Sequence, residues 1–297
     1  MLRFGRWIAA AIVTGALCFV ALRGVDVKAL RAALASASVW PLALAMALDL
    51  GLRNAARARR SLVVLRAVSP ARIGFVDLLS LVLAGRAAGC LIPGPSEEAV
   101  QTAALKRLGF RLSDLLIGQA IEKTVSLLAS AVLTFLFMPP VGLSPGLLAA
   151  GMAAVAAVSL QQIHARRGLA LGPALEAFAQ VVASNLLCAV MMWLCFTSIG
   201  APPGIGACIG ISCVTAIASA VPLLPGQFGL LESAFVLGAK QFGVGSGPAL
   251  AVALLYHATH LIPVVLGALI ATLRWRSVAG GAPSLPTTSW RSTPCAP

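Results

Sequence analysis

The chain has 297 residues, of which 59% are hydrophobic and only 10% are charged. Soluble domains carry about 45–50% apolar and about 25% charged residues, so this composition excludes an ordinary water-soluble fold. The formal net charge of +13 would suit a nucleic-acid-binding protein, but the basic residues gather at the ends of long apolar runs. We therefore expect an all-α polytopic membrane protein that contacts membrane lipids and does not bind nucleic acid.

Long apolar runs follow one another along the chain. Residues 7–22 and 32–48 form weaker spans, and the run 115–138 is interrupted by Glu122 and Lys123. A helix needs roughly 20 apolar residues to cross the hydrocarbon layer, and several runs meet that length without any Asp, Glu, Lys or Arg. These uncharged runs are residues 141–160, 178–199, 205–224 and 248–273.

The basic residues predict the orientation of the chain in the membrane. Six arginines and no acidic residue fall between positions 53 and 72. The positive-inside rule predicts a cytoplasmic loop over 53–72 and cytoplasmic N- and C-termini, in the inner (cytoplasmic) membrane of a bacterium. Residues 1–276 are expected to form one transmembrane domain. Residues 277–297, rich in Ser, Pro and Thr, are expected to form a disordered cytoplasmic tail.

Two segments must return to the side from which they enter if the basic residues are to stay inside. They are residues 73–106, interrupted by a Pro-Gly turn at 93–94, and residues 205–240, interrupted by a Pro-Gly turn at 225–226. We therefore expect a helical bundle with two re-entrant hairpins, one opening to each side of the membrane.

The two hairpins share a spacing. Glu98 and Lys106 in the first, and Glu232 and Lys240 in the second, lie eight residues apart, and a glycine follows each lysine by three residues. Ordinary helix-end signals explain this pattern, with Glu in the first turn, Lys in the last turn and Gly at the C-terminal cap. Inverted repeats, which are typical of transporters, explain it as well.

The first turn motif reads LIPGPSEE over residues 91–98, and the second reads PGQFGLLE over residues 225–232. Both resemble the turn motifs of the flippase-like, lysylphosphatidylglycerol synthase transmembrane-region family. The family's Glu-Arg pair in the next span corresponds to Glu122 and Lys123. The resemblance extends over roughly residues 5–276 and implies movement of a lipid between leaflets.

The chain also departs from the family pattern. Glu97 stands where the family has glycine, and Gln101 and Leu231 stand where arginines are expected. If those arginines hold a lipid phosphate in relatives, the headgroup chemistry here differs. Some members carry an additional soluble aminoacyltransferase domain, and this chain is expected to lack one, so we expect no aminoacylation of lipids by it.

Charged residues inside apolar runs require a partner or a function, because a charge at the bilayer centre costs about 2.5–3.5 kcal/mol on insertion scales. Arg86 is expected either to bind a phosphate or to pair with Glu97, Glu98 or Glu122. Asp49 is expected to pair with neighbouring arginines.

Glu98 and Glu232 have two interpretations, a polar path for a headgroup and a cap at a helix N-terminus. His257 and His260 lie three residues apart, and interhelical hydrogen bonds are favoured over a metal site. The candidate residues of a substrate path are Arg86, Pro93, Gly94, Glu97, Glu98, Glu122, Lys123, Pro225, Gly226, Gly229, Glu232 and His257.

These features favour a transporter or flippase that moves a lipid with a polar head, either anionic or glycan-linked. The sequence contains no nucleophile–base pair and no metal-binding motif, so we expect no catalytic residues, no cofactor and no metal. Two alternatives stay open, a membrane-embedded enzyme that modifies a lipid and a non-transporting assembly partner of enzymes that make lipids or glycans. The oligomeric state is also open.

Overall fold

The computed structural model describes residues 15, 19, 25–91, 96–138, 151, 171–219 and 229–280. In this part of the chain every regular element is helical, as the composition predicts. In chain order the helices are α2 (Val27–Ala35), α3 (Val39–Leu48), α4 (Asn54–Val68), α5 (Phe75–Leu91), α6 (Ser96–Arg107), α7 (Leu112–Phe137), α9 (Leu171–Ser198), α10 (Ile205–Ser219), α11 (Leu230–Lys240) and α12 (Ser246–Gly280). Apart from residues 15, 19 and 151, the expected spans 7–22 and 141–160 lie outside the described residues.

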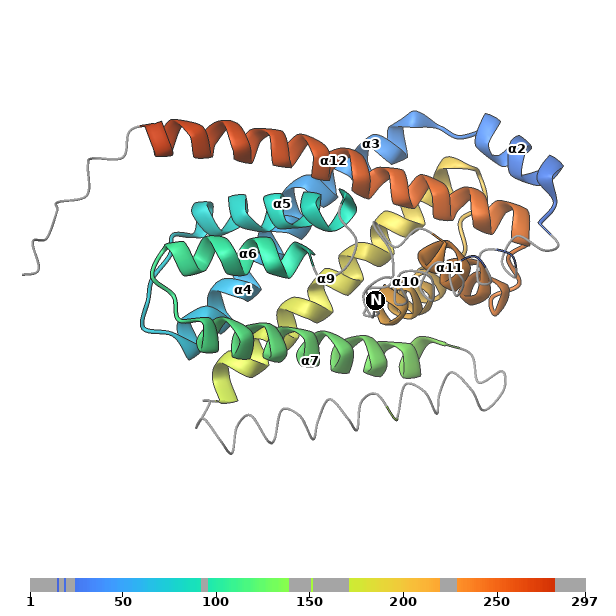
Figure 1. Cartoon of the computed structure of the whole chain (residues 1–297). Helices are drawn as coiled ribbons and strands as arrows, with labels where there is room; N and C mark the ends of the chain where they lie inside the picture. Colours follow the sequence, from blue (N-terminus) through green and yellow to red (C-terminus); the bar gives the residue numbers. More distant parts are fainter. Residues whose placement is uncertain are drawn as a thin grey trace, which may run out of the picture.

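Three of the described helices are long and apolar enough to cross a membrane. They are Leu112–Phe137, Gly172–Ser198 and Ser246–Leu269, which match three of the expected runs. Helix α12 continues to Gly280, four residues into the expected tail. Figure 1 shows α12 and α7 on opposite sides of the bundle, with α9 crossing between them.

The run 32–48 is not the single straight span that its composition predicts. The chain breaks between Ala35 and Val39, and the helices on either side meet at 83°. Pro41 is a local cause of the break, because proline fits only the first turn of a helix and so favours a new helix that starts at Val39.

Helix α3 continues into α4 through a π-helical turn, Asp49–Arg53, so residues 39–68 are helical throughout. The segment 53–72, which we expected to be a cytoplasmic loop, is therefore helical as far as Val68. The widened turn leaves backbone carbonyls without their usual donors. The Asn54 side-chain amide satisfies two of them, the Asp49 carbonyl at 2.7 Å and the Leu50 carbonyl at 3.2 Å. Turns of this kind in helices are frequent at functional sites.

Helices α5 and α6 lie antiparallel and side by side (Figure 1). Glycines on α5 permit the close approach. A Cβ atom at Gly85 would lie 3.0 Å from the Glu97 carbonyl oxygen and 2.9 Å from Cγ of Gln101. The Ser96 hydroxyl also donates to the Ala88 carbonyl at 3.1 Å, which ties the two helices together beside residues 92–95.

Helices α10 and α11 form a second antiparallel pair, with Gly238 packed against Ile211. The second helices of the two pairs end in the same way. Gly109 (φ 90°) and Gly243 (φ 75°) adopt the left-handed conformation, and their amides donate to the backbone carbonyl oxygens of Lys106 and Lys240 at 3.1 and 3.0 Å. The shared Glu–Lys–Gly spacing therefore reflects two helices with the same C-terminal cap, as the explanation by helix-end signals predicts.

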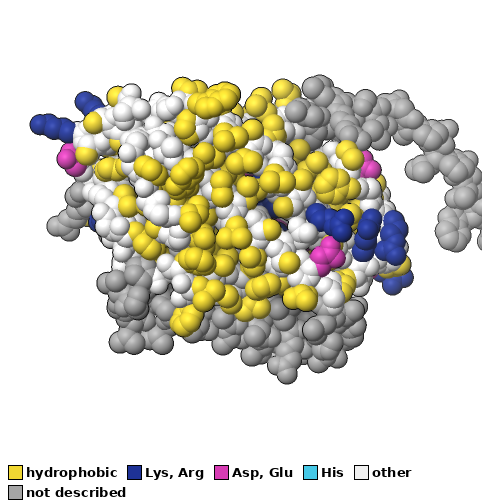
Figure 2. Space-filling view, turned by 180° about the vertical axis from the view of Figure 1, so that it is seen from behind, with side chains coloured by type: hydrophobic (Ala, Val, Ile, Leu, Met, Phe, Trp, Pro, Cys, Tyr) yellow, Lys and Arg dark blue, Asp and Glu magenta, His cyan; other side chains and the backbone are white. Residues whose placement is uncertain are grey.

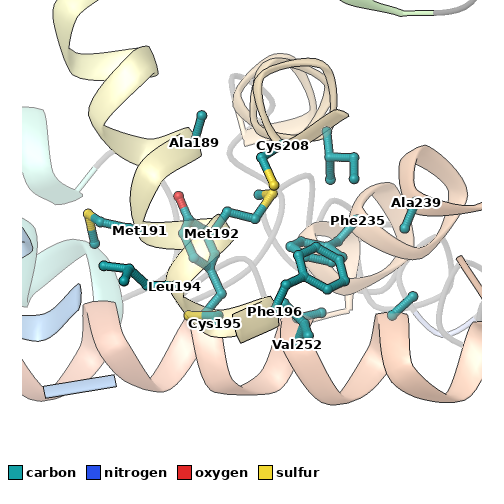
Figure 3. Packing of buried hydrophobic residues seen from close by; sticks show 14 of the residues in the cluster. Ala189, Met191, Met192, Leu194, Cys195, Phe196, Cys208, Phe235, Ala239 and Val252 are labelled. Carbon is teal, nitrogen blue, oxygen red and sulfur yellow. The ribbon is translucent and has the colours of Figure 1, made fainter. Parts of the chain in front are cut away.

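The largest core cluster lies where α9, α10, α11 and α12 meet. Figure 3 shows Phe196 and Phe235 in contact at its centre, and their ring centroids are 5.8 Å apart. Fully buried Ala189, Ala239 and Val252 allow the helices to approach closely around them. Small residues serve this purpose in membrane helices, where packing replaces the hydrophobic drive.

The outer surface exposes many large apolar side chains, which is unfavourable in water. Trp40, Val39, Phe135 and Leu175 are between 66% and 81% exposed. Figure 2 shows hydrophobic side chains over the middle of one face, with Lys and Arg gathered toward its two ends. Contiguous apolar surface of this extent indicates contact with lipid.

Candidate functional site: a charged pocket inside the bundle

A pocket of about 740 Å³ lies inside the helical bundle. Helices from both halves of the chain line it, and its walls carry five cationic side chains and three carboxylates. The cations are Arg53, Arg57, Arg60, Arg86 and Lys123, and the carboxylates are Glu97, Glu98 and Glu122. A pocket of this size accommodates a lipid headgroup or another small polar molecule.

Three ion pairs connect α4, α6 and α7 along one side of the pocket. Arg60 Nε lies 3.2 Å from a Glu122 oxygen, and Arg57 lies 3.3 Å from Glu97. The third pair joins Lys123 to Glu98, and the Lys123 side chain is 61% exposed. Because each carboxylate has its own cation, this side of the pocket is balanced in charge.

A second ionic cluster lies at the π-helical turn and is more deeply buried. Asp49, which is fully buried, accepts from Arg53 at 2.7 Å and from Arg86 at 3.1 Å. The Arg86 guanidinium also donates to the Asn54 side-chain oxygen at 2.5 Å. The side-chain nitrogen of Asn54 thus donates to the π-helical turn, and its side-chain oxygen accepts from Arg86. The local helix geometry and the long-range contact therefore depend on one side chain.

His260 completes this cluster from α12. Its Nδ1 lies 3.2 Å from the Asp49 carboxylate, and its Nε2 lies 3.0 Å from the Arg53 guanidinium. A guanidinium has only donors, and the neutral tautomer in which Nε2 accepts from Arg53 and Nδ1–H donates to Asp49 fits these contacts. The imidazole is therefore neutral and adds no charge to the cluster.

The second helix pair contributes Glu232 through His257. Glu232 accepts from the Gly229 amide at 2.6 Å, which caps the start of α11, and lies 2.8 Å from His257 Nδ1. His257 lines the pocket, whereas Glu232 lies behind it and is 7% exposed. The helix-cap interpretation of Glu232 and the expected interhelical hydrogen bond of His257 are both confirmed.

The other walls of the pocket are polar without being charged. Gln119 on α7 donates to Thr102 at 2.7 Å and to the Glu98 carbonyl at 3.3 Å, which adds to the contact between α6 and α7. Asn185 on α9 donates to Ser130 on α7 at 3.1 Å, which is an interhelical hydrogen bond.

The pocket brings together half of the residues expected in a substrate path. Arg86, Glu97, Glu98, Glu122, Lys123 and His257 line it. Gly229 and Glu232 stand next to it at the start of α11. Pro93, Gly94, Pro225 and Gly226 lie outside the described residues. The predicted partner of Arg86 is wrong, because Arg86 binds Asp49 and Asn54 rather than a glutamate.

Other pocket residues were missed. Arg53, Arg57 and Arg60 were assigned to a loop, although their spacing of four and three residues puts them on one face of a helix. That spacing was the signal in the sequence. Arg59 lies off this face and pairs with Glu176 away from the pocket, and both side chains are largely exposed.

An apolar exterior, three membrane-length helices and a charged interior pocket define a multi-pass helical membrane protein. Residues 6–268 match the family described as the lysylphosphatidylglycerol synthase TM region, and the chain belongs to this family. The match agrees with the resemblance inferred from the turn motifs and involves the membrane region only. A comparison with curated proteins finds no match to the chain.

Proposed function

We propose that the protein moves a polar-headed lipid between membrane leaflets, with the head in the interior pocket and the acyl chains in the bilayer. The observation that carries the proposal is a charged pocket of about 740 Å³ lined by helices whose outer faces are apolar. Charged side chains are costly inside a membrane protein and mark the paths of substrates or ions. A headgroup needs such a path to cross the apolar layer, and the acyl chains do not.

The two antiparallel helix pairs support this proposal. Helices α6, α10 and α11 have 12, 15 and 11 residues. At about 1.5 Å per residue they span roughly 17–23 Å, short of the roughly 30 Å hydrocarbon layer. We take α5/α6 and α10/α11 to be re-entrant hairpins of two inverted repeats. Residues beside both tips, Glu97 in the first and Leu231 in the second, line the same pocket.

The proposed setting is the inner membrane of a bacterium, with both termini in the cytoplasm. The positive-inside argument now rests on Arg59, Arg66 and Arg72, which do not line the pocket. The substrate is a membrane lipid, and enzymes of lipid or glycan synthesis would supply it. The proposal assigns the chain no catalytic step.

Reconstitution of the purified chain into phosphatidylcholine vesicles with traces of head-labelled fluorescent lipids tests the proposal. A membrane-impermeant quencher reads how much label stays in the inner leaflet. We expect the protein to accelerate the loss of protected label for an anionic lipid, with vesicles that lack protein as the control. No acceleration for anionic, zwitterionic or glycosylated lipids, with and without an imposed pH gradient and membrane potential, would contradict the proposal.

A further inference from the structure

The charges around the pocket are balanced everywhere except at the π-helical turn. Among the described residues, Glu97, Glu98 and Glu122 each pair with a separate cation. At the turn, however, two guanidiniums share the single carboxylate of Asp49. Arginine stays protonated in proteins and His260 is neutral there, so this cluster carries one positive charge that no described side chain neutralises.

The unbalanced charge faces the pocket. Arg53 and Arg86 both line it, and their side chains are only 13% and 8% exposed. The Nε atom of Arg53 is buried and has no hydrogen-bond partner among the described residues. A buried guanidinium whose charge is not balanced is costly, and an oxyanion in the pocket beside it offsets that cost.

We propose that the part of the pocket wall formed by Arg53 and Arg86 is a binding subsite for one oxyanion, the phosphate of a lipid headgroup. The surrounding groups suit such a ligand. Arg86 is held by both oxygens of Asp49 and by Asn54, so its position is fixed before a ligand arrives. Arg53 is fixed by Asp49 and His260, and its guanidinium lines the pocket. Preorganised guanidinium groups are the usual partners of phosphates.

This location differs from the glutamates expected from the sequence. Glu97 and Glu98 already hold cations of their own, so the charged side of the pocket near α6 has no excess charge for an anion. The inference rests on the proposed function only in taking the oxyanion from a lipid; binding of the anion itself does not require movement of any lipid.

Calorimetric titration of the purified full chain in detergent tests the subsite. The probes are dioctanoyl phosphatidic acid, dioctanoylglycerol with the same chains and no phosphate, and inorganic phosphate. We expect saturable binding of phosphatidic acid, none of dioctanoylglycerol, and competition by inorganic phosphate. Arg53→Gln should weaken binding by about ten-fold or more, as loss of a charge-assisted hydrogen bond does, and Arg53→Lys should restore part of it.

A second variant changes the charge while both arginines remain. Cys188 lines the same pocket as Arg53. Cys188→Asp should supply the missing negative charge and abolish phosphatidic acid binding, whereas Cys188→Ser should bind like wild type. Arg59→Gln, which removes a cation from α4 outside the pocket, is the matched control and should change nothing.

Three results separate the possibilities. Saturable binding of inorganic phosphate without phosphatidic acid would keep the oxyanion subsite and overturn its assignment to a lipid. Unchanged affinity in a folded Arg53→Gln protein, or equal losses in Arg53→Gln and Arg59→Gln, would overturn the subsite. Saturable binding in a protein that moves no lipid would contradict the proposed function and leave the subsite standing.

Discussion

Replacement of Asp49 by alanine should destabilise the protein by about 3–5 kcal/mol, the cost of leaving a buried charge without its partner. The substitution leaves the largely buried guanidiniums of Arg53 and Arg86 without a carboxylate partner. It also removes the acceptor of His260 Nδ1. Unfolding of the purified protein in mixed micelles measures the effect.

A double variant tests the cause of that loss. If unpaired charge is responsible, Asp49→Ala combined with Arg86→Met should be less destabilised than the sum of the two single variants. Glu176→Ala is the matched control, because its ion pair with Arg59 is exposed and should contribute only about 0.2–1 kcal/mol. A stability loss in Asp49→Ala no larger than in Glu176→Ala would contradict the ionic role of the cluster.

Lys123→Glu should reduce movement of an anionic lipid by about ten-fold or more, because charged hydrogen-bond partners contribute that much to affinity. The change places a third carboxylate beside Glu98 and Glu122 on the pocket wall. Its effect on stability should be small, since the Lys123 side chain is 61% exposed. Vesicle translocation and thermal unfolding are measured on the same preparation.

Lys106→Glu serves as the control for this reversal of charge. Lys106 is exposed in the last turn of α6 and does not line the pocket. The Lys106→Glu protein should therefore move lipid at the wild-type rate. The rate of the Lys123→Gln protein should lie between those of wild type and Lys123→Glu. Wild-type movement by a folded Lys123→Glu protein would remove Lys123 from the headgroup path.

The helical membrane architecture was predictable because lipid imposes it through composition. Long uncharged runs correctly indicated the regions of α9 and α12, where a helix is the only way to satisfy the backbone in lipid. The ends of α6 and α11 were also predictable, since Gly109 and Gly243 mark C-terminal caps by local chemistry alone. In both cases the signal lies within one turn or one span.

The ionic clusters were predictable only in part, because their contacts are long-range. Asp49 and Arg53 are four residues apart, and their pairing was expected. Arg86 reaches Asp49 across 37 residues, and Arg53 reaches His260 across 207. No local sequence pattern predicts contacts between residues this far apart in the chain. The π-helical turn was equally hidden, since it depends on Asn54 and on packing rather than on a propensity.

The central claim is that the interior pocket is the path of the headgroup, and blocking it with a bulky side chain tests this most directly. Ala216 on α10 lines the pocket without a charged group to lose, whereas Leu186 on α9 is 40% exposed and does not line it. We predict that Ala216→Trp lowers lipid movement in vesicles to the level of protein-free controls, while Leu186→Trp moves lipid like wild type. Movement at the wild-type rate by an Ala216→Trp protein with normal thermal unfolding would contradict the account.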